Sequence, residues 1–260
     1  MEKKVVIITG ASSGIGKATC DYLREKGYVV YNISRRESND DFSYSADVHD
    51  YKKIKQIFDN IYSKEGRVDI LINNAGFGIA GAIENAKLEN IDKLFETNLS
   101  SVVALSSMVI PYLKETKGRI INISSVAAVI PLPFQACYSA AKAGVLNFSK
   151  SLNMELKPLG VRVTAVLPGD TKTNFTSARV VDTKDDKTYS SRDINSIEKM
   201  AKDEQKGKDP ISVAKVIYKV LRKKNPPTMK TVGFGYKTLV FLIKHLPDGL
   251  VNFIVKKLYG

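Results

Sequence analysis

The sequence predicts an α/β fold in which a doubly wound parallel sheet is covered by helices on both faces. Short apolar runs rich in β-branched residues alternate along the chain with longer segments of helical period, and this alternation is typical of repeated βα units. The short runs are apolar almost throughout, as strands are when helices cover both sheet faces. The predicted strands cover residues 5–9, 29–34, 70–73, 119–124 and 161–167. The predicted helices cover residues 14–26, 51–63, 88–114, 135–156 and 210–223.

The chain has 260 residues, a length that suits one α/β domain better than two. We therefore expect a single domain over residues 1–260. Residues 170–209 depart from the βα pattern, because they are polar and charged with little apolar periodicity. They are either a disordered insertion or, as we favour, a cover over a site with one or two short helices.

Residues 233–260 form a second departure, an amphipathic C-terminal extension. Two helical segments are expected, at about 236–245 and 248–258. Three roles stay open: completing the core or a subunit contact, lining an apolar substrate entrance, or resting on an anionic membrane surface beside Lys244, Lys256 and Lys257. The apolar residues of the extension include Leu239, Phe241, Leu242, Ile243, Leu250, Phe253, Ile254 and Leu258.

Composition narrows the class of protein. The two cysteines, Cys20 and Cys137, suggest no disulfide framework, so we expect a reducing, cytoplasmic location. The formal net charge of +13 could attract nucleic acid, anionic lipid or anionic substrates. The basic residues are dispersed and match no nucleic-acid recognition motif, so no nucleic-acid partner is expected.

Two other classes of feature are not expected. No segment approaches the roughly 18 apolar residues that a membrane-spanning helix needs, and the apolar run before Gly10 is too short for a signal peptide. His49 and His245 stand apart from any His, Cys or carboxylate at ligand spacing, so no metal site is expected.

A glycine-rich turn follows the first predicted strand. The stretch "TGASSGIGKA" places Gly10, Gly14 and Gly16 between that strand and the first helix. Glycine permits a tight turn and lets a pyrophosphate approach the backbone, and the helix start supplies unpaired N–H groups. Within repeated βα units, this turn predicts dinucleotide binding on a Rossmann-type, three-layer α/β/α domain.

The end of the second strand indicates which dinucleotide is bound. An NAD site usually has an acidic residue there, which bonds the ribose 2′-OH. This chain has "YNISRRE", with Ser34 followed by Arg35 and Arg36. Guanidinium groups favour a 2′-phosphate, so the predicted cofactor is NADP(H); the alternative is a basic loop tip.

The stretch "YSAAK" places Tyr138 and Lys142 one helical turn apart with small residues between them. They could be two polar residues on an ordinary helix surface. Positions i and i+4 share one helix face, however, and an ammonium beside a phenol favours phenolate. Together with the glycine turn, the pair predicts proton transfer by a tyrosine whose pKa Lys142 lowers.

Over residues 4–175 the chain resembles the short-chain dehydrogenase/reductase family. The resemblance is carried by "TGASSGIG", "ADV" at 46–48, "NNAG" at 73–76, Asn98, "INISS" ending at Ser125, "YSAAK" and "PGDTKT" at 168–173, all in the family's order. It implies that the catalytic residues are Asn98, Ser125, Tyr138 and Lys142. The cofactor-binding residues are then Gly10, Ser12, Ser13, Gly14, Ile15, Gly16, Arg35, Asp47, Val48, Asn74, Ala75, Gly76, Tyr138, Lys142, Pro168, Gly169, Thr171 and Thr173.

The resemblance also implies the role of each catalytic residue. Tyr138 protonates the alkoxide that forms when NADPH delivers hydride, and Ser125 hydrogen-bonds the carbonyl oxygen. Lys142 lowers the pKa of Tyr138 and bonds the nicotinamide ribose, while Asn98 holds a water that links Lys142 to solvent. Ser125 is preferred to Ser124, which is expected to end the strand.

The sequence thus predicts an NADP(H)-dependent oxidoreductase that interconverts a small-molecule carbonyl compound, a ketone or aldehyde, and an alcohol. The extension loosely resembles those of family members that act on lipid-like substrates, and the family implies a homodimer or homotetramer paired through residues 88–114 and 135–156. The alternatives are a non-catalytic NADP(H)-binding redox sensor and a basic protein that binds membrane or nucleic acid.

Overall fold

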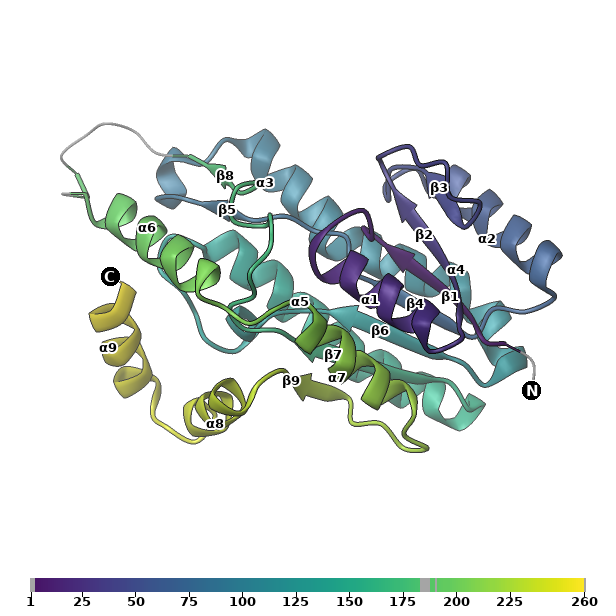
Figure 1. The fold of residues 1–260 in the computed structure, drawn as a ribbon. Helices are drawn as coiled ribbons and strands as arrows, with labels where there is room; N and C mark the ends of the chain where they lie inside the picture. The colour runs from purple at the N-terminus through teal and green to yellow at the C-terminus, as the bar shows by residue number, and fades with distance from the viewer. Residues whose placement is uncertain (1–2, 183–187, 190, 260) are drawn as a thin grey trace.

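The computed structural model describes residues 3–182, 188–189 and 191–259, except the side chain of Leu258. Within them, seven parallel strands form one sheet in the order β3-β2-β1-β4-β6-β7-β9 (Figure 1). The chain starts at the centre with β1, runs outward through β2 and β3, and then crosses back to β4 and continues the other way. The strand order therefore reverses between β1 and β4, and ligands bind at such a point. The strands are β1 (Val5–Thr9), β2 (Val29–Ser34), β3 (Ser43–Ser45), β4 (Ile70–Asn73), β6 (Arg119–Ile123), β7 (Arg162–Leu167) and β9 (Met229–Thr231).

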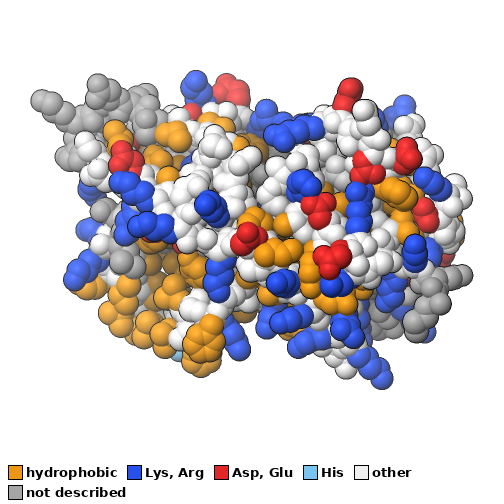
Figure 2. Space-filling view, viewed as in Figure 1, with side chains coloured by type: hydrophobic (Ala, Val, Ile, Leu, Met, Phe, Trp, Pro, Cys, Tyr) orange, Lys and Arg blue, Asp and Glu red, His pale blue; other side chains and the backbone are white. Residues whose placement is uncertain are grey.

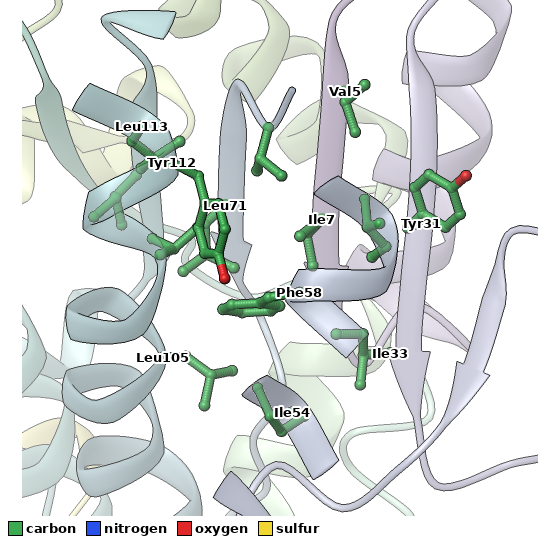
Figure 3. Packing of buried hydrophobic residues seen from close by; sticks show 14 of the residues in the cluster. Val5, Ile7, Tyr31, Ile33, Ile54, Phe58, Leu71, Leu105, Tyr112 and Leu113 are labelled. Atoms are coloured by element: carbon green, nitrogen blue, oxygen red, sulfur yellow. The ribbon is translucent and has the colours of Figure 1, made fainter. Parts of the chain in front are cut away.

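Helices cover both faces of the sheet, and alternate strand residues point to opposite cores. Val6 and Ile8 pack with α1 (Gly14–Glu25) and α7 (Ile211–Leu221) on one face. Val5 and Ile7 pack on the other face with three helices. These are α2 (Tyr51–Glu65), α4 (Ser101–Thr116) and α5 (Ala136–Leu156), and Figure 3 shows residues of the first two. The doubly wound α/β/α architecture is confirmed.

The sequence pattern located the central strands but missed the sheet edges. All five predicted strands are present, within a residue or two at their ends. The missed edge strands, β3 and β9, are three-residue segments with the sequences Ser-Tyr-Ser and Met-Lys-Thr, which are too short and polar to read as buried runs. A separate pair, β5 (Ile79–Ala80) and β8 (Val180–Val181), was also missed.

The helix predicted over residues 88–114 is interrupted. It consists of α3 (Leu88–Phe95), a π-helical turn (Glu96–Ser100) and α4. The whole stretch is long and apolar enough to cross a membrane by length and composition, contrary to the expectation from sequence. Leu105, Val109 and Leu113 are buried in the core cluster beneath the sheet, so this stretch is a core helix of the α/β/α fold.

The covering segment and the extension both contain helices within the described residues. Residues 170–182 contribute β8, and α6 (Arg192–Gln205) supplies one 14-residue helix; residues 183–187 and 190 of this segment lie outside the described chain. The extension forms α8 (Phe234–Ile243) and α9 (Asp248–Tyr259). Short 3-10 turns complete the chain at Ile83–Asn85, Val126–Ala128 and Lys157–Leu159.

Candidate active site

A cavity of about 550 Å³ lies at the carboxyl ends of the central strands. It is where the turns after β1, β2, β4, β6 and β7 meet. All of the predicted cofactor-binding residues line it. Of the four predicted catalytic residues, Ser125, Tyr138 and Lys142 line it, and Asn98 is fully buried behind it.

The glycine turn is packed against the end of β4. Gly10 has a φ of +69°, and a Cβ atom there would lie 2.9 Å from the Cα of Ala75. A Cβ on Gly16 would overlap the carbonyl oxygen of Gly10. Asn74 Nδ2 donates to the carbonyls of Thr9 (2.9 Å) and Gly10 (3.2 Å). The turn is therefore a tightly packed cradle in which only glycine fits at these two positions. The first residues of α1, at its amide-bearing end, line the cavity.

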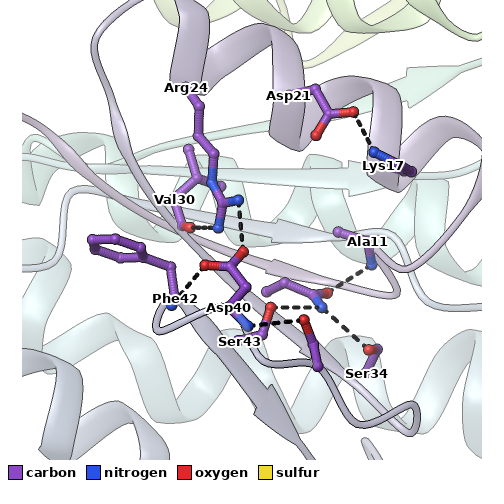
Figure 4. Close-up of polar contacts among 11 residues, drawn as sticks. Ala11, Lys17, Asp21, Arg24, Val30, Ser34, Asp40, Phe42 and Ser43 are labelled. Atoms are coloured by element: carbon purple, nitrogen blue, oxygen red, sulfur yellow. Dashed lines mark hydrogen bonds and ion pairs between the residues drawn. The ribbon is translucent and has the colours of Figure 1, made fainter.

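The end of β2 is held beside this turn by polar contacts (Figure 4). Asn32 Oδ1 accepts from the amide of Ala11 at 2.9 Å, and Asn32 Nδ2 donates to Ser34 Oγ at 3.2 Å. Arg35 and Arg36 follow, exposed and lining the cavity. In the described part of the chain no carboxylate forms an ion pair with either guanidinium, so both are available to an anion.

Tyr138 lies in the first turn of α5, and Lys142 lies one turn later. The Ser125 and Tyr138 side chains both line the cavity, and their interaction partly offsets the burial that raises the pKa of the phenol. Lys142 Nζ lies 5.8 Å from the centroid of the Tyr138 ring and donates to the carbonyl of Ile123 at 3.0 Å. Ser124 points elsewhere, since its hydroxyl donates to the Lys142 carbonyl at 2.8 Å. The serine in contact with the tyrosine is therefore Ser125.

Burial shifts both pKa values in this pair. It raises the pKa of Tyr138 to about 12, although the interaction with Ser125 opposes the rise. Burial also lowers the pKa of Lys142 to about 8. In the protein alone desolvation dominates, so the phenol is less acidic than an ordinary tyrosine. That Lys142 lowers the pKa of Tyr138 stays a prediction for the enzyme with its cofactor bound. At neutral pH the phenol keeps its proton.

Asn98 sits in the π-helical turn, where the Ser101 amide bonds to the Glu96 carbonyl. Its side chain bridges the backbone of Phe77, accepting from the amide at 3.0 Å and donating to the carbonyl at 2.8 Å. A Cβ on Gly76 would lie 2.9 Å from Asn98 Oδ1 and 3.5 Å from Lys142 Nζ. Gly76 thus lets Asn98 and Lys142 approach each other, and π turns often mark functional sites.

The covering segment contributes cavity residues that the sequence did not single out. The Phe175 ring lies 5.7 Å from the Tyr138 ring, and Glu204 of α6 also lines the cavity. Glu204 forms an ion pair with the buried Arg179 and accepts from Thr176 at 2.6 Å. No local sequence motif predicts these contacts, because each joins residues about 25 or more positions apart. The described residues of the segment thus contribute to the cavity lining, and its role as a cover stays a prediction.

Comparison with known proteins agrees with this geometry. A family model described as short chain dehydrogenase matches residues 4–184. The 3-ketodihydrosphingosine reductase of Bacteroides thetaiotaomicron is 36% identical over 267 residues, which cover 100% of this chain and 99% of that protein. The match therefore includes the covering segment and the extension.

Solved structures share the fold over most of the chain. A short-chain dehydrogenase from Streptomyces avermitilis has a TM-score of 0.82 and 27% identity, covering 98% of this chain and 95% of that one. ElxO with NADP bound has a TM-score of 0.74 and 27% identity, covering 91% and 99%. A 3-ketoacyl-(acyl-carrier-protein) reductase from Brucella melitensis, complexed with NADH, has a TM-score of 0.74 and 25% identity, covering 88% and 96%.

Proposed function

The chain belongs to the short-chain dehydrogenase/reductase family and is an oxidoreductase, and from this premise we propose that it is NADP(H)-dependent and reduces a lipophilic ketone, with Tyr138 as the acid. One observation carries the proposal. A single cavity is lined by the glycine turn, by Arg35 and by Ser125, Tyr138 and Lys142. A redox sensor needs no proton donor there, and a basic binding protein needs neither the donor nor the cradle.

The residues present fit a phosphorylated dinucleotide. Gly10 and Gly16 pack so closely against neighbouring atoms that no side chain fits at either position. They hold the start of α1 at the cavity, where its amide groups can bind a pyrophosphate. Arg35 can pair with a 2′-phosphate. The other proposed contacts come from Ser12, Ser13, Gly14, Ile15, Asp47, Val48, Asn74, Ala75, Gly76, Pro168, Gly169, Thr171 and Thr173, all of which line the cavity.

The proposed reaction divides the work among four side chains. The bound cofactor supplies the hydride. Ser125 orients the substrate oxygen by a hydrogen bond, and Tyr138, protonated at neutral pH, gives its proton to that oxygen as charge develops. Lys142 holds the cofactor ribose and, through its charge, steadies the phenolate that remains. Asn98 positions the water that leads from Lys142 to solvent.

We propose that the substrate is a long-chain ketone of the 3-ketodihydrosphingosine type. Support comes from the full-length similarity to the Bacteroides reductase and from apolar side chains on the cavity wall. These are Val126, Leu132, Phe175, Ala178 and Val180. An apolar wall favours an alkyl chain, by roughly 0.8 kcal/mol for each buried methylene.

An NADPH-consumption screen tests this function. We expect turnover of 3-ketodihydrosphingosine, with kcat/KM falling at least about tenfold when its chain is shortened by several methylenes. Quinones, retinal, steroids and 3-oxoacyl thioesters serve as comparison substrates. NADPH binding without consumption across the whole panel would instead favour the redox sensor.

The pH profile tests the state of Lys142. Its pKa is lowered to about 8, so the side chain is an ammonium below that pH and a neutral amine above it. We expect kcat/KM for reduction to be level near neutral pH and to fall about tenfold per pH unit well above 8. Tyr138 adds no loss in this range, since its pKa is about 12. Initial rates at constant ionic strength, with circular dichroism to check folding, measure this; a level profile through about pH 9.5 contradicts it.

We also propose a cytoplasmic homodimer or homotetramer that pairs through α4 and α5. Val103 and Met154 are exposed apolar residues on these two helices, as expected for a surface that a second copy covers. Light scattering of the purified chain gives its molar mass, and the mass of a single chain contradicts the pairing.

A further inference from the structure

The outer surface of α8 and α9 exposes large apolar side chains side by side. Phe234, Phe241 and Phe253 are 83%, 62% and 66% exposed. Figure 2 shows the apolar side chains gathered at the lower left, where Figure 1 places α8 and α9. We call this surface the tail face; it consists of Phe234, Leu239, Phe241, Leu242, Leu250, Phe253 and Ile254. Contiguous exposed apolar patches mark interaction sites.

The tail face is distinct from the side of these helices that completes the core. Val240, Val251 and Val255 are buried, and they form a cluster with Ile130. The inner side therefore already fulfils the core role that the sequence left open. The outer side has no such partner in the part of the chain that the structure describes.

Lysines accompany the tail face. Lys237, Lys244, Lys256 and Lys257 are exposed in residues 233–260, against one acidic residue, Asp248. Exposed phenylalanine and leucine beside lysine is the pattern of helices that lie in a membrane interface. A second copy of the chain fits less well, because a symmetric contact through this surface would bring like charges together.

The extension is fixed to the walls of the active site. Val126 and Leu132 line the catalytic cavity and also pack against the apolar cluster that Val240, Val251 and Val255 form with Ile130. Tyr236 lies over Gly169 and donates a hydrogen bond to Asp170, and both of these residues line the cavity. Tyr259 donates to Asp203 of α6 at 3.1 Å. The tail face is thus held in one orientation relative to the cavity.

We propose that the tail face docks on the surface of an anionic lipid bilayer, with its aromatic and aliphatic side chains at the acyl boundary and its lysines among the headgroups. The docked bilayer would lie against the outer side of α8 and α9, whose inner side packs with the wall formed by Val126 and Leu132. The docking itself needs neither cofactor nor turnover, so it stands or falls separately from the proposed reaction.

Vesicle flotation with the full-length chain tests the docking. We expect flotation with vesicles of phosphatidylcholine containing about 30 mol% phosphatidylglycerol, and little with pure phosphatidylcholine, since anionic lipid attracts basic segments. Higher salt should weaken the binding. The double variant Phe241→Ser/Phe253→Ser should lower the partition coefficient at least about tenfold, and Lys256→Glu/Lys257→Glu should lower it on anionic vesicles.

The matched control replaces exposed apolar residues elsewhere. Ile83 and Leu159 are 56% and 51% exposed and lie outside the extension, so Ile83→Ser/Leu159→Ser should float like the parent chain. Three outcomes overturn the proposal: the parent chain stays in the soluble fraction with both vesicles, the control variant loses binding as much as the tail-face variant, or the tail-face variant lowers the molar mass while the parent chain never floats. The last outcome would assign the surface to a second copy.

Discussion

Tyr138→Phe is expected to lower kcat for carbonyl reduction by roughly 10²–10⁴-fold while leaving the Kd for NADPH within about twofold. The substitution removes one oxygen from a side chain that keeps its volume. It takes away the proton donor that lines the cavity together with Ser125. The ring contacts with Phe175 and with the ammonium of Lys142 are retained, so the walls of the cavity stay in place.

The raised pKa of Tyr138 decides how this result should be interpreted. The phenol of the protein alone is protonated at neutral pH, since burial raises its pKa to about 12. In nearly every enzyme molecule Tyr138 is therefore protonated and able to act as the acid. The factor by which Tyr138→Phe lowers the rate should then not change with pH around neutrality. Stopped-flow measurement of NADPH oxidation separates the chemical step from product release.

Tyr62→Phe is the matched control for the loss of a tyrosine hydroxyl. Tyr62 lies on α2, where its hydroxyl donates to Glu115 at 2.8 Å outside the cavity. It should keep the parental kcat. If Tyr138→Phe retains more than about a tenth of the activity, Tyr138 is not the acid and the proposed mechanism fails.

The sequence was sufficient for the parts of the fold that local patterns encode. β1 and β4 lie between two helical layers, so their residues are apolar on both sides and read as continuous runs. The glycine turn could be recognised because Gly10 has a conformation that other residues avoid. The edge strands and the π turn carry no such signal. Neither does the desolvation that raises the pKa of Tyr138, because it depends on residues distant in the sequence.

The contacts of the covering segment and of the extension were also hard to predict from the sequence, because they join residues that are distant in the chain. Arg179 pairs with Glu204, Tyr236 with Asp170 and Tyr259 with Asp203. In the sequence these residues appear only as scattered charges and aromatic rings. These contacts also explain how the described part of the polar covering segment is held in place. It packs against the extension and forms part of the cavity wall, and it has no apolar core of its own.

Arg35→Ala is expected to weaken NADPH binding by roughly 10–100-fold and NADH binding by less than about twofold, because a hydrogen bond to a charged group contributes about 1.5–3 kcal/mol. The Arg35 side chain is exposed at the cavity beside the end of β2, and its carbonyl accepts from Ser45 Oγ at 3.2 Å. The loop is thus anchored by its backbone, which alanine preserves, and the lost group is the guanidinium alone.

The loss of one positive charge could weaken NADPH binding through the overall electrostatic field of the protein, so this effect must be separated from the local contact of Arg35. Lys114→Ala changes the net charge of +13 by the same amount from an exposed position on α4 outside the cavity, and it should leave both dissociation constants unchanged. Fluorescence titration of each variant with NADPH and NADH gives the preference directly.

Because a 2′-phosphate contact is ionic, the NADPH affinity of the parent should fall more steeply with salt than that of Arg35→Ala. An unchanged ratio of the two dissociation constants in Arg35→Ala would contradict the proposed contact, and Arg36→Ala would then show whether the neighbouring guanidinium holds the phosphate instead.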